Sequence, residues 1–466
     1  MFSRRAPKLM IPTCSGEIVG ENRVTTSSRR TAAAATAAVV AVLVLAAAVV
    51  VGVRSLDGSG GGSGAEATRV AVAGGGRAGA ATADGAGVRA AAATRSGTWE
   101  AAMSRGGPSF TDRTLRMVVH TSIGGTGLRI RLTDRYATSD LRVGSVYVAE
   151  QEAGAQGYPG TRHRVLFGGL GSTVVRAGTD KLSDVVPMAV PAGRNLLVSF
   201  YLPGTTGPSV FHRESYQTSY LSTDGRDHAA DLGGRAFPRT TSSWYYLSGL
   251  DVASPTADGT VVAFGDSITD GYHSTFDADH RWPDELARRL AAQPGGPRLG
   301  VVDAGIAGNR LLTQAPQVYR GPAGTARFTH DVLDQPGVRD AIVLEGVNDL
   351  SNDVNAGGGP LTATDLENGY RALIAEAHRS GVRVIGATIL PYSRLSPAMQ
   401  QVRQEVNTWI RTSGAFDAVA DFDRAVRDPA HPTAMLPAYD SGDHLHPDDA
   451  GMRAMAAAVD LATLTS

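Results

Sequence analysis

A serine that follows a short apolar segment is the first residue in this sequence whose setting suggests chemistry. Residues 261–264 read Val-Val-Ala-Phe, and Gly265, Asp266 and Ser267 come directly after them. A short apolar run bounded in this way predicts a central strand of a parallel sheet, and open α/β sheets bind ligands beyond the carboxyl ends of such strands. Ser267 is therefore a candidate nucleophile. It needs a base, an acid that orients the base, and oxyanion donors from elsewhere in the chain.

The candidate base and acid lie near the carboxyl end of the sequence. Asp443 and His446 stand three residues apart, just before a helix predicted to begin at Pro447. In a tight turn this spacing lets the carboxylate accept the imidazole Nδ1–H, which leaves Nε2 free to take a proton from serine. Taken alone, the same pair also fits a polar loop, and we expect the neighbouring His444 to be a loop residue.

Two glycine-rich segments after predicted strands supply candidate oxyanion donors. Gly308 brings its backbone N–H close to a substrate because it has no side chain, and Asn348 offers an amide donor. The backbone N–H of Ser267 would be the third donor. Each position also fits a plain turn residue, with Gly308 supplying a positive φ and Asn348 capping the next segment.

The elements that must position these residues alternate between strand and helix after about residue 256. Strands are predicted at 261–264, 301–303, 341–344, 382–388 and 419–422, and helices at 283–292, 365–379, 397–412 and 447–464. Such alternation predicts a doubly wound α/β domain over residues 256–466, with a parallel sheet covered on both faces.

The preceding region, residues 97–255, has a different pattern. Short alternating runs at 114–120, 128–132, 143–148 and 195–202 predict an all-β sandwich or jelly-roll domain. We expect its aromatic side chains to form core rather than a sugar-binding platform; they include Phe167, Tyr201, Trp244, Tyr245 and Tyr246. We expect its histidines to be ordinary surface or core residues; they are His120, His163, His212 and His228.

Composition excludes several classes of function. Among 466 residues, 44 lysines and arginines nearly balance 45 aspartates and glutamates, so a dedicated nucleic-acid surface is not expected. The single cysteine, Cys14, excludes an intramolecular disulfide and a multi-cysteine metal site. A metal site built from the acidic and histidine residues at 443–448 lacks a second ligand cluster, so neither metal nor cofactor is expected.

The amino-terminal fifth of the sequence, residues 1–96, does not have the pattern of a folded domain. Residues 1–30 are basic, residues 31–53 carry no charge, and residues 54–96 are rich in glycine and alanine. We predict a cytoplasmic segment, a single transmembrane anchor and a disordered linker, which would place the rest of the chain outside the cytoplasm. A signal peptide cleaved near residues 71–73 is the alternative.

The order of the four polar segments resembles the conserved blocks of the SGNH, or GDSL, hydrolase superfamily. The resemblance covers residues of about 258–464. It implies a three-layer α/β/α, flavodoxin-like fold, with Ser267 as nucleophile, His446 as general base and acid, Asp443 as the orienting acid, and Gly308 and Asn348 as oxyanion donors with Ser267. Asp303 departs from the asparagine that often opens the second block, and its own role is open. The β-domain is also similar to accessory domains of some secreted bacterial esterases.

We therefore expect a serine ester hydrolase. No Gly-x-Ser-x-Gly surrounds Ser267, which disfavours the α/β-hydrolase fold. Deacetylation of a carbohydrate is preferred as the reaction, with a lipase or lysophospholipase, or a non-catalytic glycan-binding surface protein, as alternatives. Asp270 is expected to hydrogen-bond within its own turn, and His273 and His280 to lie at the rim of the site.

Overall fold

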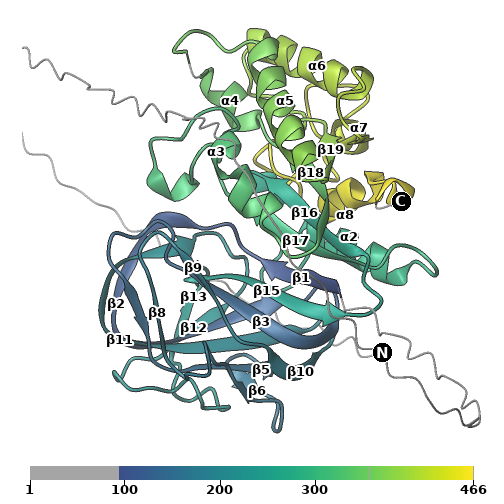
Figure 1. Ribbon diagram of the computed structural model, residues 1–466. Coiled ribbons are helices and arrows are strands. Elements are labelled where there is room, and N and C mark those ends of the chain that lie inside the picture. The colour runs from purple at the N-terminus through teal and green to yellow at the C-terminus, as the bar shows by residue number, and fades with distance from the viewer. Residues whose placement is uncertain (1–93, 356, 465–466) are drawn as a thin grey trace, which may run out of the picture. The chain divides into compact units, whose positions relative to one another are not determined.

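The computed structural model describes residues 94–355 and 357–464, which belong to one compact unit (Figure 1). The predicted basic segment, membrane anchor and almost all of the predicted linker lie outside the described residues. The linker prediction extended to residue 96, but the first strand, β1, already begins at Thr94. Within the described part of the chain, no helix has the length and apolar character needed to cross a bilayer.

Residues 94–254 form antiparallel sheets. One sheet has the order β1 (Thr94–Glu100), β15 (Leu247–Ser254), β3 (Gly125–Thr133) and β10 (Val186–Val190), and β9 (Asp180–Leu182) pairs with β3. The other has the order β13 (Arg239–Thr241), β12 (Ser219–Leu221), β2 (Ser104–His120), β11 (Asn195–His212), β5 (Val146–Ala153) and β6 (Gln156–Gly157), with β14 (Trp244–Tyr245) beside β11 and β7 (His163–Arg164) beside β5. A short pair, β4 (Leu141–Val143) and β8 (Thr173–Val175), completes the all-β part.

The antiparallel sheets enclose a common apolar core, as their alternating pattern predicts. In β10, for example, buried and exposed side chains alternate residue by residue. The expectation that the aromatic residues form core is confirmed for Phe167, Trp244, Tyr245 and Tyr246, which are buried. Trp244 also packs edge to face against Trp99, with ring centroids 5.0 Å apart.

Residues 259–420 form the predicted parallel sheet. Its strand order is β17 (Leu299–Gly305), β16 (Gly259–Gly265), β18 (Val338–Leu344), β19 (Arg383–Ala387) and β20 (Ala418–Ala420). In order along the chain this is 2-1-3-4-5, which is the flavodoxin-like arrangement. After β17 the chain crosses back past β16 to form β18 on its other side. The carboxyl ends of β16, β17 and β18 therefore lie together where the strand order switches.

Helices connect the parallel strands. They are α1 (Ser267–Asp270), α2 (Trp282–Ala292), α3 (Gly324–Phe328), α4 (Val347–Asn352), α5 (Ala363–Arg379), α6 (Pro397–Thr412), α7 (Phe422–Val426) and α8 (Asp449–Ala458), with short turns η1 (Val318–Arg320), η2 (Thr329–Leu333) and η3 (Leu461–Thr463). Right-handed crossovers to opposite sides of β16 place α2 on one face of the sheet and α5 and α6 on the other. Figure 1 shows α5 and α6 together, apart from α2 and α8.

The helix ends follow local sequence signals. Pro283 occupies the first turn of α2, and its Trp282, Leu286 and Leu290 are buried on one stripe, as predicted. Thr362 and Asp365 form a capping box at the start of α5. The closing helix is shorter than predicted. Asp448 caps it by accepting from Ala450 and Gly451 N–H, and it ends at Ala458 because the chain becomes extended at Val459.

Strand β1 joins the antiparallel and parallel sheets. Gly97 N–H donates to Thr260 Oγ1 at 2.9 Å, and Ala101 forms a parallel bridge with Asp303. A Cβ atom at Gly300 would lie 2.0 Å from the Gly97 carbonyl oxygen, so β17 needs glycine at this crossing. The antiparallel part of the chain, residues 94–254 (the β-part), is thus packed directly against edge strand β17 of the parallel sheet.

Candidate active site

Ser267 is the first residue of α1, at the carboxyl end of β16. The carboxylate of Asp266 caps the helix by accepting from Ile268 N–H at 3.0 Å. A Cβ atom at Gly265 would lie 2.2 Å from Thr269 Oγ1 and 2.5 Å from the Leu344 carbonyl oxygen, which only glycine avoids. The Gly-Asp-Ser sequence therefore builds a tight strand-to-helix turn that directs the serine hydroxyl beyond the sheet.

The hydroxyl of Ser267 meets the imidazole of His446. Ser267 Oγ and His446 Nε2 are 2.8 Å apart, although the two residues are separated by 179 positions in the sequence. On the other side of the ring, His446 Nδ1 lies 2.5 Å from Asp443 Oδ2. An ionised carboxylate only accepts hydrogen bonds, so the Nδ1 proton lies towards Asp443 and Nε2 is free to accept from Ser267.

Asp443 is fixed by its own turn. Its Oδ1 accepts from His446 N–H at 2.8 Å and from Leu445 N–H at 2.9 Å. Burial raises the pKa of this carboxyl, but the hydrogen bonds from His446 lower it by more, so the pKa lies below its ordinary value. Asp443 is therefore ionised at neutral pH and holds the imidazole in one orientation.

The predicted oxyanion donors Gly308 and Asn348 line the same cleft as Ser267 and His446. Gly308 has a φ of +77°, which suits glycine. Among the described residues, the backbone N–H groups of Ser267 and Gly308 have no hydrogen-bond acceptor. Asn348 Nδ2 donates to the Asn309 carbonyl oxygen at 2.9 Å and more weakly to Asp266 Oδ2 at 3.4 Å, and these contacts fix the orientation of its amide.

A buried arginine that the sequence reasoning missed ties the strand ends together. Arg327 donates to the carbonyl oxygens of Gly265 at 2.7 Å and Ala304 at 2.8 Å, and it pairs with Glu345 at 3.2 Å. These groups belong to the ends of β16 and β17 and to the residue after β18. A fourth partner, Asp331 at 3.0 Å, stands four residues later on the same helical segment, and this spacing is the one signal visible in the sequence.

Several carboxyl groups lie buried behind the nucleophile. Burial raises the pKa of Asp266 to about 7 and that of Asp349 to about 6. Asp349 accepts from Leu311 N–H at 2.8 Å and from Leu312 N–H at 3.0 Å, so it fixes the segment after Gly308. Asp303, whose role the sequence leaves open, also lies in this buried group. Its Oδ1 accepts from Gly305 N–H, and its buried Oδ2 has no partner among the described residues. Burial raises the pKa of this carboxyl to about 7.

The β-part reaches the site through His212, the last residue of β11. His212 Nε2 lies 2.9 Å from Asp270 Oδ1, and Asp270 Oδ2 accepts from Ala307 N–H at 2.9 Å. The expectation that Asp270 hydrogen-bonds within its own turn was wrong for its side chain, which instead links β11 to the residue before Gly308. Burial lowers the pKa of His212, but the charge of Asp270 raises it by more, so the pKa lies above its ordinary value.

The remaining histidines near the site have separate partners. His444 is exposed and its Nδ1 lies 2.7 Å from Asp440 Oδ2, as expected of a loop residue. His280 pairs with Glu285 at 2.8 Å. His273 is exposed at the rim, with Nε2 3.4 Å from Asp443 Oδ2. One ligand atom from each of His273, Asp443 and His446 lies within 4.8 Å of the others, but two of these three residues already hydrogen-bond each other and Ser267.

Ser267 and His446 open onto a cleft of about 400 Å³. Its lining is mostly polar and aromatic, and its only aliphatic members are Ala307 and Leu445. The other lining residues beyond those described above are Arg213, Glu214, Tyr272, Tyr319, Arg320, Tyr392 and Arg394. Tyr272 packs beside His446 with ring centroids 4.7 Å apart. A buried hydroxyl, an oriented imidazole and free N–H groups in one cleft are the parts required for nucleophilic attack on a carbonyl carbon.

Residues 263–454 match the GDSL-like lipase/acylhydrolase family, and this region contains the serine, the histidine, the carboxylate and both candidate oxyanion residues. Comparison with curated proteins finds no match.

Solved structures similar to this chain include a GDSL-like lipase from Bacteroides thetaiotaomicron, with 20% identity, 44% of this chain and 87% of that chain covered, and a TM-score of 0.33. An aryl esterase from M. smegmatis has 16% identity, covers 43% of this chain and 95% of that chain, and has a TM-score of 0.34. A carbohydrate acetylesterase from Sinorhizobium meliloti has 14% identity, covers 42% of this chain and 94% of that chain, and has a TM-score of 0.33.

Proposed function

Residues 263–454 belong to the GDSL-like lipase/acylhydrolase family, and we propose that this carboxylic ester hydrolase works through an acyl-enzyme on Ser267. The observation that carries the proposal is the 2.8 Å contact between Ser267 Oγ and His446 Nε2, with the ionised Asp443 behind the ring.

In the first half of the reaction, Ser267 Oγ attacks the ester carbonyl carbon while its proton passes to His446 Nε2. The carbonyl oxygen becomes negatively charged and accepts from the N–H groups of Ser267 and Gly308 and from the amide of Asn348. When the tetrahedral intermediate collapses, the bond to the alcohol oxygen breaks and His446 gives its proton to the departing alcohol. The acyl group remains on Ser267.

In the second half, water replaces the alcohol. His446 takes a proton from the water as it attacks the acyl carbon, and the proton returns to Ser267 Oγ when the carboxylic acid leaves. Throughout both halves Asp443 keeps the same tautomer of His446 and stabilises its protonated form. No other reactant is required.

The test is the substitution Ser267→Ala, assayed with p-nitrophenyl acetate. We expect turnover to fall by at least about 10⁴-fold, because the nucleophile is lost while the fold remains. Ser380→Ala, at an exposed position after α5, is the matched control and should retain full activity. Undiminished turnover by Ser267→Ala would exclude the proposal. Absence of hydrolysis by the unaltered protein would instead favour the non-catalytic glycan-binding alternative.

Among ester substrates we propose short acyl groups on a polar alcohol, such as an acetylated carbohydrate, rather than lipid esters. The support is the lining of the cleft, since only Ala307 and Leu445 are aliphatic and arginine and tyrosine side chains prevail. A long acyl chain gains about 0.8 kcal/mol for each methylene that it buries, and this lining offers little surface for such burial. Activity on p-nitrophenyl esters should therefore not rise from acetate to octanoate. A rise of tenfold or more would favour the lipase alternative.

We further propose that the catalytic part acts outside the cytoplasm, held by the uncharged segment at residues 31–53. Fractionation of cells that express the full chain tests this proposal, because the protein should be found with membranes or in the medium. Recovery in the cytoplasmic fraction alone would contradict it.

A further inference from the structure

Positively charged side chains gather in the catalytic cleft of a protein whose formal net charge is only −1. Arg213, Arg320 and Arg394 line the cleft, against the carboxylates of Glu214 and Asp443. Asp443 is engaged by His446, and Arg213 Nε lies 3.1 Å from Glu214 Oε1. Among the described residues, the guanidinium groups of Arg320 and Arg394 have neither an ion pair nor a hydrogen bond, so both are available to a ligand. With His446 neutral, three arginines against two carboxylates give the cleft lining an excess of one positive charge.

Arg320 lies directly against a candidate oxyanion donor. A Cβ atom at Gly308 would lie 2.7 Å from Arg320 Cδ and 2.8 Å from its Nε, so the arginine side chain covers this face of the glycine. The backbone at Arg320 is anchored, because its carbonyl oxygen accepts from Asn309 Nδ2 at 2.7 Å, and Asn309 Oδ1 in turn accepts from the buried Arg327 at 2.8 Å. The backbone that carries the Arg320 side chain is thus fixed beside Gly308 by a chain of polar contacts.

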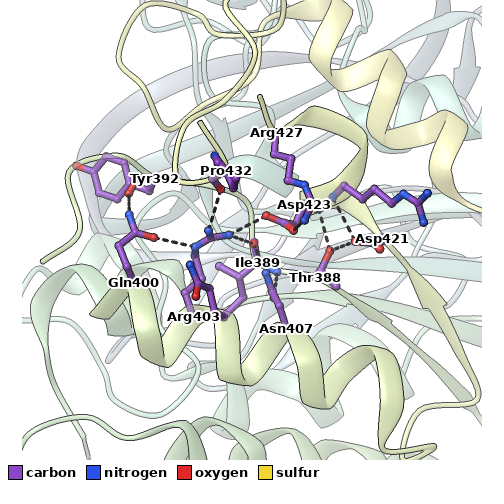
Figure 2. A network of polar contacts seen from close by, with 12 residues as sticks. Thr388, Ile389, Tyr392, Gln400, Arg403, Asn407, Asp421, Asp423, Arg427 and Pro432 are labelled. Atoms are coloured by element: carbon purple, nitrogen blue, oxygen red, sulfur yellow. Dashed lines mark hydrogen bonds and ion pairs between the residues drawn. The ribbon is translucent and has the colours of Figure 1, made fainter. Parts of the chain in front are cut away.

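Arg394 is carried by the loop between β19 and α6, and this loop is also anchored. Figure 2 shows the polar network beneath it: Asn407 binds the N–H and carbonyl oxygen of Ile389 at 2.7 and 2.8 Å, and Gln400 Nε2 donates to the Tyr392 carbonyl oxygen at 2.6 Å. Arg403 joins the same network through Asp423 at 2.8 Å. The segment before Arg394 is therefore preorganised, which lowers the cost of presenting its charge to a ligand.

The third arginine comes from the β-part. Arg213 follows β11, and its guanidinium lies 4.3 Å from the ring centroid of Tyr319, another residue of the cleft lining. Its pairing with Glu214 leaves it able to donate to a further acceptor, because a guanidinium has five N–H donors.

We propose that the substrate is an ester that carries an anionic group, a carboxylate, sulfate or phosphate, bound by Arg320 and Arg394. This inference rests on the proposed esterase function and specifies its substrate class. Guanidinium groups bind such oxyanions through paired, charge-assisted hydrogen bonds, and a cleft with more cationic than anionic side chains attracts anionic substrates. The anionic group takes no part in bond breaking and leaves with either the acid or the alcohol product.

The test compares matched substrates that differ in charge. One pair is 4-acetoxybenzoate and neutral 4-acetoxybenzamide, with the charge on the alcohol side. The other is mono-p-nitrophenyl succinate and the p-nitrophenyl ester of succinamic acid, with the charge on the acyl side. For each pair the measured quantity is the ratio of kcat/KM for the anionic ester to that for the neutral ester, determined for the unaltered protein, Arg320→Gln, Arg394→Gln and Arg379→Gln.

We expect each cleft substitution to lower this ratio about tenfold in at least one pair, as the loss of one charge-assisted contact implies. A fall in the succinate pair alone places the anion on the acyl side, and a fall in the benzoate pair alone places it on the alcohol side. Arg379 is exposed at the end of α5, outside the cleft lining, and its substitution should leave both ratios unchanged. Ratios that stay within about twofold of the unaltered protein in both pairs and both cleft variants would overturn the proposal.

A measurement without substitutions covers the case in which a variant does not fold. In the unaltered protein, the ratio of kcat/KM for the anionic ester to that for the neutral ester should fall as the sodium chloride concentration is raised, because salt screens the attraction to the cleft. This is expected in the pair whose anionic ester is hydrolysed faster than its neutral one. A salt-independent ratio near unity in both pairs would also overturn the proposal. Hydrolysis of the neutral esters, with its loss in Ser267→Ala, reports separately on the proposed esterase function.

Discussion

Hydrogen bonds position the three side chains that the proposed reaction uses. Ser267 Oγ meets His446 Nε2, and the ring is held from behind by Asp443, whose second oxygen accepts two backbone N–H groups of the same turn. The carboxylate therefore acts by orientation and charge rather than by taking the proton. Replacing it with an amide of the same shape separates these contributions.

Asp443→Asn should lower kcat about 10⁴-fold with a much smaller effect on KM, because an amide favours the wrong tautomer of His446 and places a proton on Nε2. The chain offers a matched control in Asp428 and His431, which have the same spacing and a 3.0 Å contact, but there the histidine is exposed and the aspartate half-buried. Asp428→Asn should leave p-nitrophenyl acetate hydrolysis unchanged. Similar rates for the two variants would contradict the role of Asp443.

We expect the buried carboxyl group of Asp303 to make the free energy of unfolding depend on pH. Burial raises its folded pKa to about 7, against about 3.9 in an unfolded chain. The folded state therefore binds the proton more tightly, and the contribution of this group to stability is complete below about pH 4 and is lost as the pH rises to about 7. Asp303→Asn should remove this decline, whose upper limit is about 4 kcal/mol.

The measurement is urea unfolding at pH 5 and pH 8, the second being above the folded pKa. The free energy of unfolding of Asp303→Asn should change less between the two pH values than that of the unaltered protein. An equal change in both proteins would show that Asp303 does not titrate between the folded and unfolded states as its burial implies.

At the scale of elements, the site depends on how strand β11 meets the turn after the nucleophile. His212, at the end of β11, reaches Asp270, and Asp270 holds the N–H of Ala307 next to Gly308. The antiparallel part thus positions one side of the candidate oxyanion site, and Arg213 and Glu214 extend it along the cleft. We infer that the β-part is a structural component of the catalytic centre.

His212→Gln should therefore lower kcat for a small neutral ester about tenfold, since Asp270 loses its partner and the segment before Gly308 loosens. Asp270→Asn should have an effect of the same direction. His228→Gln is the control, because His228 lies in the same β-part and its imidazole pairs with Asp224 and Asp231, away from the cleft lining. If kcat of His212→Gln equals that of the control, the link from β11 to the site has no catalytic consequence.

These elements also show what the sequence predicts and where it fails. The turn at Ser267, the helix caps and the strand order follow from neighbouring residues, because glycine, proline and capping side chains act within a few positions. The contacts of Arg327 and His212 span 62 and 58 positions, so no local pattern indicates them. The sequence holds Asp-x-x-His four times, at 270–273, 277–280, 428–431 and 443–446. Only tertiary structure shows that the histidine of the last one contacts Ser267.

At the scale of the whole molecule, the antiparallel and parallel sheets belong to one compact unit. Arg131 contacts Gln335 at 3.1 Å, and Gln335 donates to the buried Glu100 at 2.6 Å, so polar contacts accompany the crossing of β1 over the parallel sheet. Pattern changes along the sequence predict two kinds of sheet, but they carry no information about how tightly the sheets are joined.

The contacts between the antiparallel and parallel sheets predict that the described part of the chain unfolds cooperatively. In hydrogen exchange followed by mass spectrometry, the most protected amides of β2 and β11 should lose protection at the same urea concentration as those of β16 and β18. Loss of esterase activity should follow the same transition. Two separate midpoints would show that the sheets unfold independently and that the β-part is a removable attachment.

Ser267 is the residue that we expect to become acylated, and mapping of covalent labelling measures this most directly. A serine-directed fluorophosphonate is added to the unaltered protein, which is then digested and analysed by mass spectrometry. We predict one phosphonyl group per chain on the peptide that contains Ser267, and much slower labelling in His446→Ala, because the base no longer withdraws the proton from the hydroxyl. Labelling of a different residue, or ester hydrolysis that continues while Ser267 is fully labelled, would contradict the account.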